Sequence, residues 1–419
     1  MSKPTSTRRR EGTVSSLSIA TYFPFARVFP VSQVVEERGP TARSLITFGS
    51  DPNARPRCWQ CEQPVDRVHS YHVRRLRDLK LAHAVVELDI PQRKLRCPRC
   101  GIRAEAHDFF DPFRRCTRRL EAAVADLCRV LPVKQVAAHY GLSWHTVKEI
   151  DKRRLITEVG TPSYDDLRLL AIDEISVHKG HRYMTTVLNL ETGRLVWVGH
   201  GRTKATLLGF FDELASDQLA SIEAIAVDMA NTYRQAIEEA CPEAALVYDP
   251  FHVIAHYGRT VVDRVRLDES KKQSEEGRRY IKGSRYLLLK NEENLSDDQR
   301  VRLQELLDAN EALSTVYVLK DQLKQLFRYH NPERAVRGLH QWCELAKASG
   351  LVPLKRFATM LLQHQEGIVN HARYPIHTGR LEGMHNRIKV IKRQAYGFRD
   401  DAYFILKIKA AFPDRLQPD

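Results

Sequence analysis

The sequence contains no run of about 18 apolar residues and no charged-then-apolar segment at its start. The first absence argues against a membrane-spanning helix and the second against a secretory signal, so we expect a cytoplasmic protein with no membrane partner. Internal repeats and long low-complexity tracts are missing too. A chain of 419 residues is long for a single domain, and its length suggests about two to four of them.

Acidic residues are also comparatively few. Asp and Glu number 52 against 66 Lys and Arg, which leaves a formal charge of +14. Such an excess favours an acidic polymer as partner, above all nucleic acid. Because 43% of the residues are hydrophobic, the chain can bury ordinary cores and should be globular.

Cysteine is sparse, with eight in the chain, yet four of them are paired at short spacing. The segments "CWQC" and "CPRCG" join Cys58 with Cys61 and Cys97 with Cys100. In a reducing compartment two such pairs point to a metal, because four thiolates complete a tetrahedral Zn²⁺ site. A redox dithiol or a chance pattern is the alternative, but a redox motif does not normally occur twice in this form. We expect structural zinc in a ribbon, with a strand hairpin between the pairs.

A helical segment with a glycine break follows the cysteine pairs. Residues 119–155 carry apolar residues at helical spacing up to the turn at "YGLS", after which Ser143 can cap a further helix. Trp144, Val147 and Ile150 would form its inward side. This is helix-turn-helix spacing, and the alternative is a three-helix unit without DNA contact. The predicted DNA contacts are Ser143, His145, Thr146, Lys148, Lys152 and Arg153.

Residues 168–266 alternate strand and helix patterns in the order β-β-β-α-β-α-β-α. The apolar runs "LRLLAID" and "IEAIAVD" end in Asp173 and Asp228. In the ribonuclease-H-like core that this order matches, the first and fourth strands are neighbours, so their ends can bring both acids together. A single Asp after a strand is usually a turn or cap residue, whereas two carboxylates at close range need a cation between them. We therefore expect Mg²⁺ or Mn²⁺ in a site suited to phosphoryl transfer.

A basic helix near the C-terminus carries a single acid in its first turn. In "TGRLEGMHNRIKVIKRQAYGF" the apolar residues share one stripe and the cations occupy the other faces, with Glu382 near the start. An acid at a helix N-terminus can simply suit the helix dipole. The alternative, which we favour, is that Glu382 completes the carboxylate cage around the metal. Residues that could hold the DNA strand being cut are His385, Asn386, Lys389, Lys392 and Arg393.

Four blocks of the sequence resemble, in order, those of the ISL-three family of bacterial insertion-sequence transposases. They are "AIDEISVHKGHRYMTTVLNLETGRLVWVGHGR", "AIAVDMANTYRQAI", "YDPFHVIAHY" and "LEGMHNRIKVIKRQAYGFRD". The likeness spans nearly the whole chain, since the cysteine pairs resemble that family's N-terminal zinc finger and the helix-turn-helix lies where the family has one. It implies a DDE enzyme whose acidic triad is Asp173, Asp228 and Glu382.

The resemblance also implies the partners. They would be double-stranded DNA, both as terminal inverted repeats and as target, and further copies of the chain, since handling two element ends argues for a homodimer or higher oligomer. The protein would lie in the bacterial cytoplasm, at the nucleoid when bound to DNA. Two other functions stay open: a catalytically silent DNA-binding regulator, and a ribonuclease-H-like nuclease that cuts without joining.

The predicted fold class is a multidomain chain of α+β and α/β type. It comprises a zinc ribbon, a helix-turn-helix, and a ribonuclease-H-like DDE core with an α-helical insertion. The predicted boundaries are 1–20 for a disordered basic tail, 21–115 for the zinc ribbon, 116–160 for the helix-turn-helix, 161–266 for the first part of the core, 267–370 for the insertion and 371–419 for the last part of the core with the third acid.

Overall fold

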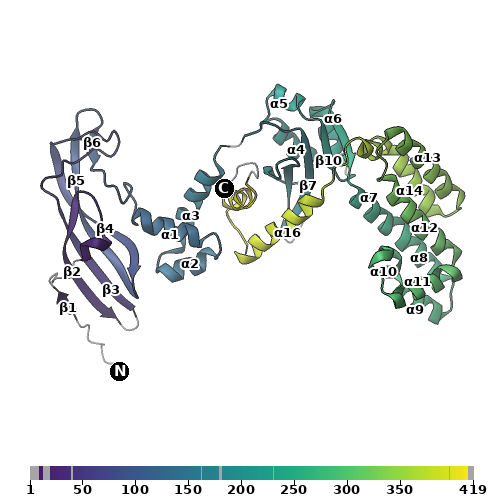
Figure 1. Ribbon diagram of the computed structural model, residues 1–419, viewed down its shortest axis with the longest axis horizontal. Helices are drawn as coiled ribbons and strands as arrows, with labels where there is room; N and C mark the ends of the chain where they lie inside the picture. The colour runs from purple at the N-terminus through teal and green to yellow at the C-terminus, as the bar shows by residue number, and fades with distance from the viewer. Residues whose placement is uncertain are drawn as a thin grey trace. The chain divides into compact units, whose positions relative to one another are not determined.

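The computed structural model describes residues 9–12, 19–38, 41–161, 163–178, 182–229, 231–395 and 397–413 (Figure 1). By its internal contacts the chain divides into two compact units. The first comprises residues 1–158 and 394–397, and the second residues 159–393 and 398–419. The units have separate hydrophobic cores.

The first unit begins with a six-stranded sheet in the order β1-β2-β3-β5-β4, with β6 paired to β5. Neighbouring strands are antiparallel except β3 and β5, which are parallel. The core of this sheet centres on Ile46, Leu76 and Leu88, which are fully buried. The elements are β1 (Arg9–Gly12), the 3-10 helix η1 (Ile19–Tyr22), β2 (Val28–Arg38), β3 (Thr41–Ser50), β4 (Val68–Leu81), β5 (Ala84–Cys97) and β6 (Gly101–Ala104).

The disordered tail predicted for residues 1–20 is wrong in part. Arg9–Gly12 form β1, which pairs antiparallel with β2, and η1 begins at Ile19. Residues 1–8 and 13–18 lie outside the described part of the chain. No apolar pattern marks β1, because a strand can join a sheet edge through its backbone groups alone.

Three helices follow the sheet: α1 (Arg118–Leu127), α2 (Val133–Tyr140) and α3 (Trp144–Val159). Their ends have local chemical causes. The Thr117 hydroxyl accepts a hydrogen bond from the backbone N–H of Leu120, and the Ser143 hydroxyl accepts one from that of Thr146. Gly141 ends α2 in the left-handed region at φ 62°, which glycine adopts without strain. The predicted helix-turn-helix spacing is therefore present.

The predicted inward side of α3 is right at two positions and wrong at one. Val147 and Ile150 are buried in the apolar cluster of the three helices. Trp144 is 45% exposed and lies outside that cluster. As the first residue of α3 it is free to face solvent, where the Lys148 ammonium lies 5.5 Å from the centre of its ring.

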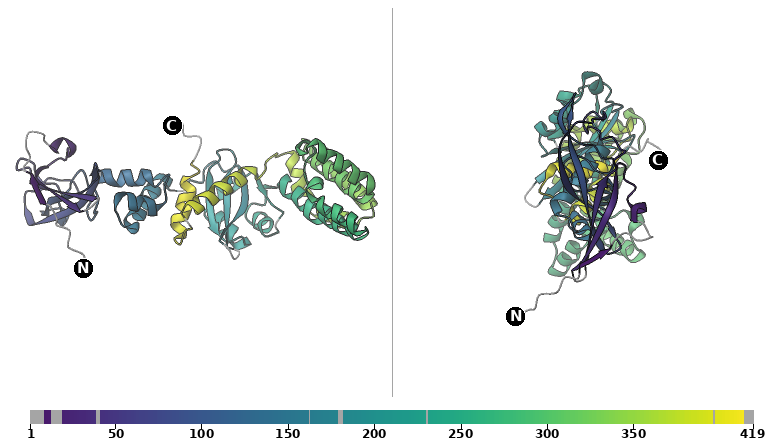
Figure 2. Two further views of the ribbon diagram at one scale, coloured as in Figure 1. Left: turned by 90° about the horizontal axis from the view of Figure 1, so that it is seen from below. Right: turned by 90° about the vertical axis from the view of Figure 1, so that its left-hand side faces the viewer.

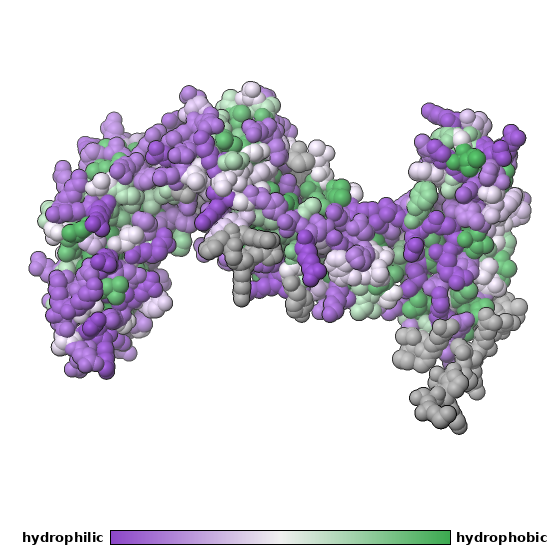
Figure 3. All heavy atoms as spheres, turned by 180° about the vertical axis from the view of Figure 1, so that it is seen from behind, coloured by the Kyte–Doolittle hydropathy of each residue, from purple (hydrophilic) through white to green (hydrophobic). Residues whose placement is uncertain are grey.

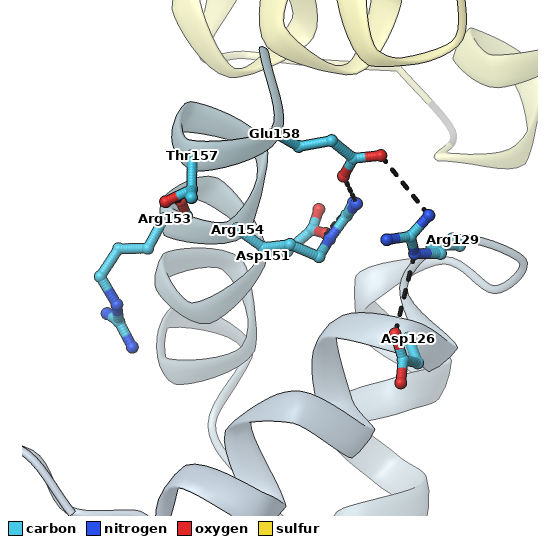
Figure 4. A network of polar contacts seen from close by, with 7 residues as sticks. All are labelled: Asp126, Arg129, Asp151, Arg153, Arg154, Thr157 and Glu158. Atoms are coloured by element: carbon cyan, nitrogen blue, oxygen red, sulfur yellow. Dashed lines mark hydrogen bonds and ion pairs between the residues drawn. The ribbon is translucent and has the colours of Figure 1, made fainter. Parts of the chain in front are cut away.

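A network of ion pairs joins the end of α1 to α3 (Figure 4). Arg154 contacts both Asp151 and Glu158, and Glu158 also lies 3.4 Å from Arg129, which in turn approaches Asp126. The Asp151 side chain is fully buried, so its charge must be met by a partner inside the protein. The network therefore fixes how α3 lies against the first helix.

The second unit is built on a five-stranded sheet in the order β11-β10-β7-β8-β9. The strands are β7 (Leu169–His178), β8 (Arg182–Asn189), β9 (Leu195–His200), β10 (Ala224–Val227) and β11 (Ala245–Tyr248). β7, β8 and β9 are antiparallel, while β10 is parallel to both β7 and β11. The first and fourth strands of this unit are thus neighbours, as predicted.

Helices cover both faces of this sheet (Figures 1 and 2). On one face, Phe210 of α4 packs in the same core as Ile172 of β7. On the other, Leu381 and Ile388 of α16 pack with Ala171 of β7. Successive residues of β7 therefore face opposite layers, as a strand requires. The helices are α4 (Lys204–Phe211), the short α5 (Ser216–Ala220), α6 (Asn231–Ala240), α16 (Gly379–Gln394) and α17 (Asp401–Ala410).

Helices occupy the whole stretch between β11 and α16. The helical character predicted for residues 267–370 is confirmed, but the helices begin earlier, at Pro250, and residue 267 lies inside α8. The elements are α7 (Pro250–Tyr257), the π-helix η2 (Gly258–Val262), α8 (Asp263–Lys271), α9 (Glu275–Gly283), α10 (Arg285–Leu289), the 3-10 helix η3 (Glu292–Asn294), α11 (Asp297–Ala309), α12 (Glu311–Leu326), α13 (Pro332–Ala348), α14 (Val352–Gln363), α15 (Gln365–Val369) and the 3-10 helix η4 (Asn370–Ala372).

Hydrophilic residues dominate the surface seen in Figure 3, with apolar residues scattered among them. Within the described ranges, no helix combines the length and the apolar character that crossing a membrane would take.

Candidate active site

Two of the predicted acids lie on neighbouring strands. Asp228 directly follows β10, whereas Asp173 lies inside β7, which continues to His178 and does not end at Asp173 as predicted. The parallel register pairs Ala226 with Ala171. Asp228 and Asp173 each lie two residues further on, so they reach the same level of the sheet. Their juxtaposition follows directly from the strand order, which the sequence pattern predicts.

The electrostatics of Asp173 reflect this crowding. The pKa of Asp173 is raised to about 6, chiefly by burial; the charges of Asp228 and Glu174 act in the same direction, while the backbone N–H of Glu174 and the nearby His252 oppose the rise. The Glu174 N–H donates to Oδ1 of Asp173 over 2.8 Å. A buried carboxyl beside a second carboxyl gains strongly from a cation placed between them.

Glu382, in the first turn of α16, opens onto the same pocket as Asp173. This pocket has a volume of about 420 Å³, and its wall includes Asp173, Glu382, His252 and Lys389. Asp228 is not among the lining residues. Within the described residues, the three acids do not bring their oxygens within 4.8 Å of one another, since only the four cysteines form a metal-binding group that close. Glu382 is exposed.

The donor set nevertheless suits a hard divalent cation. Carboxylate oxygens are the ligands that Mg²⁺ and Mn²⁺ prefer. Asp173 within β7 and Asp228 just after β10 lie on adjacent strands, and Glu382 faces the pocket of Asp173. The raised pKa of Asp173 shows that negative charge there lacks full compensation from the protein. The residues present therefore fit such an ion.

His385 has a different place from the one predicted. It is 6% exposed, and burial lowers its pKa to about 4, so it is neutral and cannot serve as a cation for DNA. Its Nε2 lies 3.0 Å from the Thr186 hydroxyl, and its Nδ1 lies 3.5 Å from Oδ2 of Asp173. The Thr186 hydroxyl also donates to the backbone carbonyl of Asp173 over 3.0 Å. His385 and Thr186 thus support the first acid.

Asp249 is a further acid whose role emerges only from the structure. It is 2% exposed at the end of β11 and accepts a 2.7 Å hydrogen bond from the backbone N–H of Phe251, which caps α7. Its other oxygen accepts hydrogen bonds from both the backbone N–H and the hydroxyl of Thr378. Thr378 immediately precedes α16, so Asp249 ties the end of the sheet to the helix that carries Glu382. The apolar run "ALVYD" followed by Pro250 was the available sequence signal.

The four paired cysteines lie close enough together to hold a metal ion. Their sulfur atoms all lie within 4.8 Å of one another, and Cys61 and Cys97 are 3.6 Å apart. Zinc–sulfur bonds of about 2.3 Å would place tetrahedral sulfurs about 3.8 Å apart. Burial raises the pKa of Cys97, but the N–H groups of Cys100 and Arg99 and the neighbouring thiols outweigh it and lower the pKa to about 7. The hairpin of β4 and β5 separates the two pairs, as predicted.

The predicted DNA contacts of α3 are not equivalent. Ser143 and His145 are exposed, and the Ser143 hydroxyl lies 2.8 Å from that of Thr146. Lys148 and Lys152 are half-buried. Arg153 points away from the network in Figure 4 and forms an ion pair of 2.9 Å with Glu121 of α1. That pairing leaves Arg153 less available to phosphates than periodicity suggests. On α16, Lys389 lines the acidic pocket, Lys392 is half-buried and Arg393 is exposed.

Comparison with known proteins identifies the family. A family model described as "Transposase" matches residues 170–408, and the "Helix-turn-helix domain of transposase family ISL3" matches residues 105–155. The chain is 44% identical over 359 residues to the transposase for insertion sequence element IS1001 of Bordetella parapertussis, covering 85% of this chain and 88% of that protein. The chain belongs to transposase family ISL3.

A second relative is more distant. The transposase for insertion sequence element IS1557 of Mycobacterium tuberculosis is 28% identical over 350 residues, covering 78% of this chain and 79% of that protein. This transposase is accordingly a DNA-binding enzyme that cleaves and transfers DNA, with a helix-turn-helix next to its catalytic domain. Membership of a DDE family implies a divalent metal, and the cysteine cluster is able to bind zinc.

Proposed function

We propose that this transposase uses Asp173, Asp228 and Glu382 to hold two divalent metal ions in a ribonuclease-H-like core. The observation that carries the proposal is the parallel register of β7 and β10, which sets Asp173 level with Asp228 while Glu382 faces the pocket of Asp173. Mg²⁺ or Mn²⁺, when bound, would activate the attacking oxygen and stabilise the leaving one. DNA would be cleaved to expose a 3′ hydroxyl, which then joins target DNA by direct transesterification.

The chain's own residues position these groups. His385 of α16 and Thr186 of β8 contact Asp173, and the link between Asp249 and Thr378 holds the start of α16. Lys389 adds a positive charge to the pocket wall, where a DNA phosphate would lie. Lys392 and Arg393 follow on the same helix and would contact the backbone of the bound strand.

The remaining parts would recognise the DNA ends. A zinc ribbon over residues 21–115, with Zn²⁺ on the four cysteines, and a helix-turn-helix over 116–160 would bind the terminal inverted repeats. His145, Thr146 and Lys148 are the α3 residues placed to read base edges. Residues 161–266 and 371–419 would form the core around the insertion of 267–370. Synapsis of two ends implies a homodimer or higher oligomer on DNA in the cytoplasm.

Amide substitutions test the triad. D173N, D228N and E382Q keep the size of each side chain but remove the charge that a metal needs. We expect each to lower Mg²⁺-dependent strand cleavage and joining at least a thousandfold, while binding to element-end DNA changes less than about threefold. The measurement is a cleavage and joining assay on the element's flanking DNA, with Mg²⁺ and with chelator.

E223Q is the matched control. Glu223 lies just before β10, at the opposite end of the same strand from Asp228, and pairs with Arg168 over 2.8 Å. It should cleave like the parent protein. Substantial cleavage by any of the three triad variants would overturn the proposal, and a parent protein that binds ends yet never cleaves would mark a silent regulator.

A further inference from the structure

One face of the β4-β5-β6 sheet forms an open groove that the proposed function leaves unassigned. Its volume is about 840 Å³, within the range of about 300–1,000 Å³ typical of ligand sites. The floor comes from His72 of β4 and from Gln92 and Lys94 of β5, while the loops carrying Trp59 and Phe113 provide a wall.

Three exposed aromatic residues line the groove: Tyr71 on β4, and Trp59 and Phe113 in the loops. Trp59 is 37% exposed and Phe113 is 80% exposed, and their rings meet edge to face with centres 6.5 Å apart. Phe113 also has φ of 66°, a backbone conformation that bulky side chains rarely adopt and that costs about 1–3 kcal/mol. The fold thus holds Phe113 in an unfavourable backbone conformation although its side chain is not buried. Such strain typically marks a position shaped by binding.

The groove is also basic. Its lining includes Arg74, Lys94 and Arg103 and no Asp or Glu. Lys94 is exposed and has no ion-pair partner among the residues that the structure describes. The Arg103 guanidinium is oriented by a 2.6 Å hydrogen bond from its Nε to Oε1 of Gln60. His72 and Gln92 are joined by a 3.0 Å hydrogen bond on the floor. The charge therefore suits an anion.

Flat apolar rings beside cations match one chemistry better than others. A nucleotide offers a planar base that stacks on an aromatic ring and a phosphate that meets a cation. In duplex DNA the base faces are stacked on each other and cannot reach the rings, so the occupant must be unpaired. An acidic peptide would satisfy the cations but would leave the exposed rings without a stacking partner.

We propose that this groove binds unpaired nucleotides of DNA, with bases stacked on Trp59 and Phe113 and phosphates held by Lys94 and Arg103. The inference rests on the proposed function only in taking DNA as the substrate. It adds a single-strand site to the ribbon, so that an element end could be engaged in a locally melted form.

Binding of the full-length chain to a labelled oligothymidine strand tests this, measured by fluorescence anisotropy without divalent metal. We expect W59A and F113A each to weaken binding about 5- to 100-fold, the range for losing one stacked base. W59F and F113Y keep a ring and should bind within about threefold of the parent. K94Q should also reduce the salt dependence, by about 0.7 in the slope of log affinity against log salt.

F29A is the control, because Phe29 of β2 is an exposed aromatic residue of the same unit outside the groove and away from α3. It should leave oligothymidine binding unchanged. Equal losses in F29A and W59A, or unchanged binding in the double variant W59A/F113A with zinc content intact, would overturn the proposal. So would equally tight, ring-dependent binding of polyglutamate. D173N should bind oligothymidine normally, so a failure of the catalytic assignment is distinguishable from a failure of this one.

Discussion

At the scale of single residues, Lys320 in α12 combines burial with a titratable group. It is 2% exposed, and its ammonium donates to the backbone carbonyls of Leu288 and Lys290 over 2.5 and 3.0 Å. Burial lowers the pKa of Lys320 to about 8, and the charge of Lys324 contributes in the same direction. Burial of the charged Lys320 therefore destabilises the folded insertion by an amount that depends on pH.

We expect the stability of the parent protein relative to K320M to rise as the pH increases from 8 to 10.5. In this window the unfolded chain holds a proton that the folded chain has released, so stability rises with pH, by up to about 3 kcal/mol. Below pH 8 both states hold the proton and the difference levels off. Urea unfolding of both proteins across this window measures the effect. A constant difference in unfolding free energy between the two proteins would contradict it.

The residues of the site were predictable to different degrees. The proximity of Asp173 and Asp228 could be foreseen because apolar runs mark the two strands and the strand order makes them neighbours. The end of β7 could not, because the polar stretch after Asp173 continues the strand to His178. The buried position of His385 could not be predicted, because helical periodicity does not reveal which side of α16 faces Thr186 on the sheet. The prediction that Trp144 faces inward failed for a related reason, since the first residue of a helix can point to solvent even when the apolar pattern assigns it to the core.

At the scale of elements, the start of α16 depends on one buried interaction. The carboxylate of Asp249 holds both the N–H and the hydroxyl of Thr378, and both residues are almost inaccessible to solvent. Glu382 lies one helical turn further on, and its backbone N–H donates to the Thr378 carbonyl over 3.2 Å. The position of the third acid is therefore coupled to this interaction.

We expect T378V to lower the rate of strand cleavage about 10- to 100-fold on prebound end DNA, because small misplacements of a catalytic group have effects of that size. DNA affinity should stay unchanged, since the DNA-reading helices lie elsewhere. T378S retains the hydroxyl and should cleave at a rate close to the parent's. Equal single-turnover rates for T378V and T378S would show that the hydroxyl does not position Glu382.

Whole elements follow the sequence pattern where side chains drive them. The alternation of strands and helices from β7 to α7 has this origin, since each element buries its own apolar face. β1 escapes prediction because its residues show no apolar alternation in the sequence. The boundary at residue 267 fails because α7, η2 and α8 continue one another without a break.

At the scale of the whole molecule, the proposed zinc site should stabilise only part of the chain. A strong chelator, or C97S, should remove one zinc ion per chain. The small core of Val65 and Leu95, which packs with the four cysteines, should then lose their support. Structural zinc contributes roughly 10–16 kcal/mol of apparent binding free energy, so the ribbon should lose order. End-DNA binding should fall, while the second unit keeps its thermal transition because it has a separate core.

Zinc content by mass spectrometry and limited proteolysis between residues 51 and 67 measure these effects. C241A is the control, since Cys241 is buried in the second unit and has no place in the cluster. Full zinc content in C97S would refute the four-thiolate assignment.

The position of Glu382 along the chain has a consequence for incomplete copies of the protein. The segments proposed to recognise element ends are synthesised first, and domains generally fold as they emerge from the ribosome. Any product that stops within the insertion would retain the ribbon and α3 but lack the third carboxylate. Such fragments would occupy element ends without cutting them, so premature termination would produce a dominant competitor of the full-length enzyme and restrain the spread of the element.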